Sequence, residues 1–171
     1  VTAHNGRIYA ESKQGKGATF VVELPLVAAA EPTEKSKATK KEPWQQKGAK
    51  ILVVDDETGV LNFLKRLLTE QGYEVETVDR ARAALIKLRR ERYDLILLDI
   101  KMPGKSGIWL YRHIEAMGPT MVQRVMFITG DVMETKTRDF LEETRARHIA
   151  KPINIEQLRK NINHILTRGP V

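Results

Sequence analysis

Residues 95–103 read Leu-Ile-Leu-Leu-Asp-Ile-Lys-Met-Pro, an apolar run that ends in a single acid, Asp99. A run that is apolar on both faces is typical of a central parallel strand. Two similar signals lie elsewhere, because the pair Asp55-Asp56 and the cation Lys151 also follow apolar runs. The carboxyl ends of the strands form the ligand crevice of an open parallel sheet. The sequence therefore predicts three carboxylates and one ammonium group at one edge of a sheet.

Strand and helix patterns alternate from residue 49 onward. Strands are expected at 51–54, 73–78, 95–98, 125–129 and 148–150, and helices at 60–68, 81–88, 107–117, 133–145 and 155–165. Five such units predict an α/β fold with a doubly wound parallel sheet. Polar residues in the second strand favour an edge position, and hence the flavodoxin-like order 2-1-3-4-5. Asp79 is expected to cap the second helix, and Ile155 to lie on the inner face of the last.

Composition limits the classes of function. The chain has 171 residues and no cysteine, which excludes disulfides and thiolate metal sites. No apolar run approaches the ~20 residues of a membrane span, so a cytoplasmic protein without membrane contact is expected. The net charge of +7 could indicate nucleic acid binding. However, the basic residues are interleaved with acids along the helices, so a solvated surface is favoured and no nucleic acid partner is expected.

The chain is expected to contain two folded parts. Residues 27–48 are rich in Ala, Lys, Glu and Pro, which is typical of a flexible linker. This linker would separate a short N-terminal piece, residues 1–26, from a larger domain at 49–168. Because the chain does not begin with Met, we interpret it as a piece of a longer protein.

The predicted cluster of acids indicates phosphoryl chemistry. Carboxylates that lie close together repel each other unless a cation is present, and Mg²⁺ prefers oxygen ligands. Asp99 could then act as a nucleophile and form an aspartyl phosphate. A phosphoryl group in transfer needs positive charge and hydrogen-bond donors around its oxygens. Lys151 and the hydroxyl of Thr129 are suited to these two roles.

Five motifs occur in order along the larger domain. They are Asp55-Asp56-Glu57, the stretch from Asp99 to Pro103, Gly107, Thr129-Gly130 and Lys151-Pro152. Intervals of 43, 30 and 22 residues separate Asp56, Asp99, Thr129 and Lys151. With these motifs and intervals, residues 49–168 resemble a response-regulator receiver domain of two-component signalling.

The resemblance implies a role for each motif. Asp99 would be the phosphorylation site, and it would bind Mg²⁺ directly together with Asp56 and the carbonyl group of Lys101. Asp55 would bind the metal through water, and the Lys151-Pro152 bond would be cis. The phosphate donor would be a histidine kinase or a histidine phosphotransfer protein. Such a domain catalyses only its own phosphorylation and dephosphorylation and passes the signal on through changes in its surface.

Three positions near the site vary within the family. His148 stands where the family often has Tyr or Phe, and we expect it to move together with Thr129 on phosphorylation. Lys101 and Asp131 flank the expected phosphoryl group and carry opposite charges. We expect them to pair above the site and to slow hydrolysis of the phosphate.

The N-terminal piece carries a second resemblance. The segments that carry it resemble the last hairpin of a histidine-kinase ATPase domain. They are His4-Asn5-Gly6-Arg7-Ile8, Ser12, Gly15-Lys16-Gly17-Ala18-Thr19-Phe20 and Leu24-Pro25. Glycines in this motif allow the backbone to approach a nucleotide closely. The parent protein would thus be a hybrid histidine kinase with a C-terminal receiver domain. Because the rest of the ATP site is missing, this chain is not expected to bind ATP.

Two other functions stay open at this stage. A haloacid-dehalogenase-like phosphatase also uses Mg²⁺ and an aspartate nucleophile at a strand end. That family needs two acids separated by one residue on its first strand, whereas this chain has Asp55-Asp56-Glu57 there. A degenerate receiver that acts only as a scaffold is the other alternative, although the complete set of acids argues against it.

Overall fold

The computed structural model describes residues 7–13, 17–23, 43–130 and 134–168. The chain divides into two units, residues 1–41 and 42–171. In the first unit, β1 (Arg7–Lys13) and β2 (Gly17–Glu23) pair as an antiparallel hairpin. Ile8, Phe20 and Val22 share one face of this hairpin and are exposed. A hairpin therefore occupies the region in which the sequence analysis places one.

The second unit is a parallel sheet with helices on both faces. Its elements are β3 (Lys50–Val54), α1 (Thr58–Glu70), β4 (Glu74–Val78), α2 (Ala81–Arg90), β5 (Leu95–Asp99), α3 (Gly107–Glu115), α4 (Pro119–Val122), β6 (Val125–Thr129), α5 (Thr135–Thr144), β7 (Arg147–Ala150) and α6 (Ile155–Arg168). The strand order is β4-β3-β5-β6-β7 and every neighbouring pair is parallel. The predicted doubly wound sheet, its order 2-1-3-4-5 and its edge strand are therefore confirmed.

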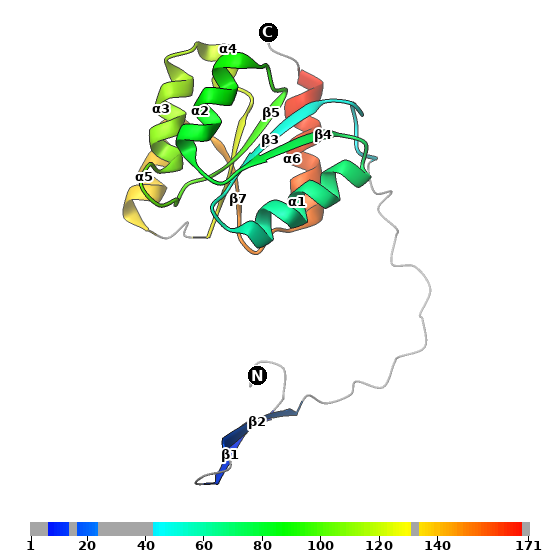
Figure 1. The fold of residues 1–171 in the computed structure, drawn as a ribbon, viewed down its shortest axis with the longest axis vertical. Helices are drawn as coiled ribbons and strands as arrows, with labels where there is room; N and C mark the ends of the chain where they lie inside the picture. The colour runs from blue at the N-terminus through cyan, green and yellow to red at the C-terminus, as the bar shows by residue number, and fades with distance from the viewer. Residues whose placement is uncertain (1–6, 14–16, 24–42, 131–133, 169–171) are drawn as a thin grey trace. The chain divides into compact units, whose positions relative to one another are not determined.

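Two apolar layers hold the helices against the sheet. On one face, α2, α3 and α5 pack against alternate residues of the strands, including Leu98 and Phe127. On the other face, α1 and α6 pack against the intervening residues, including Leu97 and Ile128. Figure 1 shows this arrangement, with the helices of each group on their own side of the sheet. All five residues of β5 are buried, which explains why the four residues before Asp99 are apolar on both faces of the strand.

Three details differ from the predictions. Ile155 is 46% exposed, because it is the first residue of α6 and lies outside the apolar layer. Asp79 does not cap α2, because the helix starts one residue later with Arg80 at the N-cap position and no side-chain cap bond. The one-turn helix α4 was not predicted, since four residues are too few to show a helical period.

Residues 43–48, which the sequence analysis places in the linker, pack against the second unit. The Trp44 ring meets the Tyr73 ring edge-on, with 6.0 Å between centroids. The Tyr73 hydroxyl donates to the carbonyl oxygen of Gln45 at 2.7 Å. Asn163 on α6 donates to the carbonyl oxygen of Pro43 and accepts from the Gln45 amide. The packed unit therefore begins before residue 49.

None of the helices within the described residues is long and apolar enough to cross a membrane.

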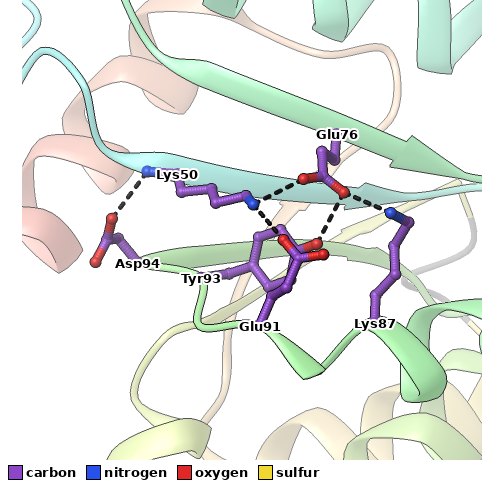
Figure 2. A network of polar contacts seen from close by, with 6 residues as sticks. All are labelled: Lys50, Glu76, Lys87, Glu91, Tyr93 and Asp94. Atoms are coloured by element: carbon purple, nitrogen blue, oxygen red, sulfur yellow. Dashed lines mark hydrogen bonds and ion pairs between the residues drawn. The ribbon is translucent and has the colours of Figure 1, made fainter. Parts of the chain in front are cut away.

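A polar network fastens the edge strand β4 to α2 and to the start of β3 (Figure 2). Glu76 on β4 is at its centre: its carboxylate pairs with Lys50 at 2.8 Å and with Lys87 at 2.6 Å. It also accepts a hydrogen bond from the Tyr93 hydroxyl at 2.9 Å. Lys50 pairs with Glu91 as well. Hydrogen bonds from Lys50 and Lys87 lower the pKa of Glu76 to about 2.

Candidate functional site

The ends of four neighbouring strands bring the predicted site residues to one edge of the sheet. Asp55 follows β3, Asp99 ends β5, Thr129 ends β6, and Lys151 follows β7. The strands are in register there, and the backbone amide of Lys151 donates to the carbonyl oxygen of Thr129 at 2.8 Å. Residues that are up to 96 positions apart therefore meet at the carboxyl edge, where α/β sheets bind their ligands.

Lys151 is at the centre of this cluster. Its Nζ atom lies 2.9 Å from Asp55 Oδ2 and 3.3 Å from Asp99 Oδ1. Both carboxylates are buried, with side chains 2% and 3% exposed. A third carboxylate, that of Glu57, approaches Nζ to 2.7 Å from the solvent side. One ammonium group thus neutralises part of the charge of three acids.

Burial and charge act in opposite directions on these groups. Burial raises the pKa of Asp99 to about 6, the ammonium of Lys151 opposes this, and the carboxylates of Asp55 and Asp56 add to it. Burial alone would lower the pKa of Lys151, but hydrogen bonds to Glu57 and Asp55 and the charge of Asp99 raise it overall. Lys151 therefore stays positively charged at physiological pH. Its charge does not fully offset the burial of Asp99, so ionisation of Asp99 is still less favourable in the folded chain than in water.

The backbone around Asp99 leaves no room for a larger residue at Gly107. Its amide donates to the carbonyl oxygen of Ile100 at 2.9 Å. A Cβ atom at Gly107 would lie 2.0 Å from the carbonyl oxygen of Asp99. Ser106 then caps α3 by accepting a hydrogen bond from the Trp109 amide. On the other side of the site, the Lys151–Pro152 bond is cis, as the family resemblance implies.

The donor set fits a hard divalent cation. Asp55 and Asp99 are buried carboxylates, and Asp56 lines a cavity of about 650 Å³ together with residues of the loop after β5, Pro103 and Gly104. The charges of Asp55 and Asp56 both raise the pKa of Asp99, a repulsion that a cation would relieve. No three acidic or histidine side chains form a ready metal cage in the described part of the chain. In the expected set, a backbone carbonyl group at Lys101 would supply one of the direct ligands, an oxygen donor of the kind that hard divalent cations prefer.

The side chain of Lys101 forms an ion pair with a residue of a different loop. Its Nζ atom lies 2.8 Å from Glu134, the residue before α5. The expected partner, Asp131, lies outside the described residues. The ion pair with Glu134 joins the loop after β5 to the start of α5.

Thr129 and His148 share one face of the sheet. Thr129 is opposite Ala150 and His148 is opposite Phe127 in the parallel β6–β7 register, so all four side chains project to the side that α5 covers. Thr129 is fully buried, whereas His148 is exposed. This placement is compatible with coupled movement, because a shift of Thr129 toward the site would change the space that is available to side chains of β7 on the same face of the sheet.

The fold and this edge together define a class: doubly wound α/β domains with buried acids and a lysine at the strand ends. Residues 51–163 match the family described as response regulator receiver domain. The chain therefore belongs to this receiver-domain family of two-component signalling.

Three relatives are informative. The autoinducer 2 sensor kinase/phosphatase LuxQ of Vibrio vulnificus is 31% identical over 161 residues, 93% of this chain and 19% of LuxQ. The receiver domain of a histidine kinase from Syntrophus aciditrophicus has 28% identity and a TM-score of 0.64, with 71% and 92% of the two chains covered. The response regulator TrrA of Thermotoga maritima, solved with Mg²⁺-BeF, has 30% identity and a TM-score of 0.60, covering 69% and 99%. This chain spans less than a fifth of the curated relatives it matches.

Two residues of the site had no role in the sequence analysis. Glu57 was noted only as part of an acidic motif, although its place directly after two aspartates was a usable signal. Glu134 was not considered, because nothing in the sequence shows that the start of α5 faces Lys101. Both contacts depend on side chains that extend between elements distant in the sequence.

Proposed function

We propose that this chain is the phosphoacceptor receiver of a hybrid sensor histidine kinase, and that Asp99 takes phosphate from a phosphohistidine. The observation that carries this proposal is the ammonium of Lys151 between two buried carboxylates. In this position it can neutralise charge on a phosphoryl group attached to Asp99. The partner would be a histidine kinase or a histidine phosphotransfer protein in the cytoplasm, and neither nucleic acid nor a membrane would be involved.

The reaction is a phosphoryl transfer between two side chains. A carboxylate oxygen of Asp99 forms a bond to phosphorus while the bond from phosphorus to the imidazole nitrogen breaks, and the electron pair stays on the imidazole. Since the pKa of Asp99 is about 6, this carboxylate is mostly ionised at neutral pH. Lys151 and the Thr129 hydroxyl can donate to the phosphoryl oxygens. Mg²⁺, held by Asp56, Asp99 and the Lys101 carbonyl group, with Asp55 through water, would neutralise charge on those oxygens.

The hybrid-kinase context has its own support. The match to LuxQ, a sensor kinase/phosphatase, covers 93% of this chain and so extends beyond residues 51–163. A hairpin at residues 7–23 agrees with the proposed remnant of an ATPase domain at residues 1–26. Residues 27–42 would then be a linker.

The test is the intact mass of the purified chain after incubation with acetyl phosphate and Mg²⁺. A receiver gains one phosphoryl group, which is stable in acid and removed by hydroxylamine. Asp99→Asn should abolish the gain, whereas Asp139→Asn, at an exposed position on α5, should retain it. Release of phosphate from p-nitrophenyl phosphate with turnover would instead indicate a phosphatase. Absence of both reactions would indicate a scaffold and would overturn the proposal.

A further inference from the structure

Glu57 makes the shortest of the three contacts to the Lys151 ammonium. Its carboxylate lies 2.7 Å from Nζ, compared with 2.9 Å for Asp55 and 3.3 Å for Asp99. Its side chain is 61% exposed, whereas those of the other two acids are buried. The shortest contact is therefore made by the side chain with the most freedom to turn away.

The backbone of Glu57 is held firmly while its carboxylate is not. Its amide donates to Asp55 Oδ1 at 2.9 Å, and Glu57 occupies the N-cap position of α1. However, its side chain makes no capping hydrogen bond to the helix. The carboxylate of Glu57 therefore does not cap α1, and its ion pair with Lys151 calls for a different explanation.

The ammonium group has three N–H donors, and three carboxylates surround it. A phosphoryl group on Asp99 would need at least one of these donors. Asp55 is buried, and withdrawing the ammonium from it would leave its charge with the backbone amide of Glu57 in place of a cation, at high cost. Glu57 can turn into water instead, where an exposed ion pair is worth only ~0–1 kcal/mol.

We propose that Glu57 is a positioning residue that competes with the phosphoryl group for the Lys151 ammonium and thereby slows phosphorylation of Asp99. This inference rests on the proposed function. Glu57 acts through Lys151 and touches no reacting atom. Its carboxylate occupies part of the ammonium's hydrogen-bonding capacity until a phosphoryl group displaces it.

The test compares the wild type with Glu57→Gln and Glu57→Ala. Two quantities are measured with Mg²⁺ present: the initial rate of phosphorylation by acetyl phosphate, and the affinity for beryllofluoride from isothermal titration. Both variants should react about two- to fivefold faster and bind beryllofluoride more tightly by a similar factor. Glu70→Gln is the matched control, because Glu70 lies at the other end of α1 and pairs with Arg66. It should leave both quantities unchanged.

The direction of the change separates positioning from a structural role. If Glu57 only supported α1, its removal would loosen the site and lower both the rate and the affinity. Unchanged or lower values in both variants, with a wild type that is phosphorylated, would overturn this inference and leave the proposed function standing. A wild type that takes up no phosphate would overturn the proposed function, and this inference with it.

Discussion

At the scale of single residues, the ionised form of Asp99 destabilises the folded chain, because its carboxylate is buried close to Asp55 and Asp56. Its pKa is about 6 in the folded chain, against an ordinary value of 3.8. As the pH rises between these values, the unfolded chain releases the proton and the folded chain retains it. The free energy of unfolding therefore falls over this range and stays reduced above about pH 6.

Replacing Asp99 by Asn should remove this cost. At pH 7.5 we expect the free energy of unfolding of Asp99→Asn to exceed that of the wild type by about 1–3 kcal/mol. The difference should fall below about 1 kcal/mol near pH 4, where the carboxyl group of the folded wild type is neutral and that of the unfolded chain is only partly ionised. Urea unfolding at the two pH values measures it, with Asp139→Asn as the control. A variant less stable than the wild type at pH 7.5 would contradict this account.

The placement of Thr129 leads to a prediction about the switch. We expect the Thr129 hydroxyl to move toward a phosphoryl mimic and the His148 side chain on β7 to reorient into the space that Thr129 leaves. With Mg²⁺ and beryllofluoride, amide chemical shifts in α5 and β7 should change less in Thr129→Ala and His148→Ala than in the wild type. Thr120→Ala, at an exposed site on α4, should behave as the wild type. Full responses in both switch variants would refute the coupling.

At this scale, the sequence predicts which residues lie at the strand ends. The apolar runs before Asp55, Asp99 and Lys151 determine the strands, and a parallel sheet brings their carboxyl ends together. The partners of exposed side chains are less predictable. The contact between Glu57 and Lys151 joins residues 94 positions apart, and it depends on rotamers that no local pattern encodes.

Among the elements, the start of α3 is tightly constrained at Gly107. A Cβ atom at Gly107 would overlap the backbone of Asp99, so the loop after β5 would have to move. We expect Gly107→Ala to lower the free energy of unfolding by about 1–3 kcal/mol and to slow phosphorylation. Gly59→Ala in α1 is the control, since nothing lies within 4 Å of its Cβ position and Ala favours a helix. Equal stability of Gly107→Ala and wild type in urea would show that the packing is looser than described.

The edge strand β4 depends on the network around Glu76 (Figure 2). Its pKa is lowered to about 2 from an ordinary value of 4.5. The resulting stabilisation is thus present above pH 4.5 and is lost as the pH falls toward 2. Since Glu76 is about a third exposed, we expect Glu76→Gln to cost only about 1–2 kcal/mol at pH 7.

Urea unfolding at pH 7 and pH 3 checks this expectation. The difference between Glu76→Gln and the wild type should be smaller at pH 3 than at pH 7. Glu74→Gln, an exposed position on the same strand, should match the wild type at pH 7. A cost for Glu76→Gln that does not change with pH would show that packing, and not charge, is responsible.

Helices and strands could be predicted where their apolar residues recur with a regular period. The strands and long helices show clear patterns, and their existence and order were predicted. Their ends were not, because helix caps depend on local backbone angles: α2 starts after Arg80, with Asp79 one residue too early. Ile155 fits the helical spacing of α6 but lies in its first turn, beyond the apolar layer.

At the scale of the whole molecule, the receiver unit is self-contained around its own two apolar layers. Composition predicted a linker before it, but not that Trp44 and Gln45 would pack against Tyr73. An aromatic residue in a polar stretch was the available signal. Because the receiver unit has its own core and site, the central claim can be tested directly on this chain.

The most direct test is to locate the phosphate. The chain is incubated with acetyl phosphate and Mg²⁺, the acyl phosphate is reduced with borohydride, and peptides are mapped by mass spectrometry. We predict that residue 99 alone is converted to homoserine. We also predict that no labelled phosphate is incorporated when labelled ATP replaces acetyl phosphate. Reduction at Asp55, Asp56 or any other acid, with Asp99 intact, would contradict the first prediction.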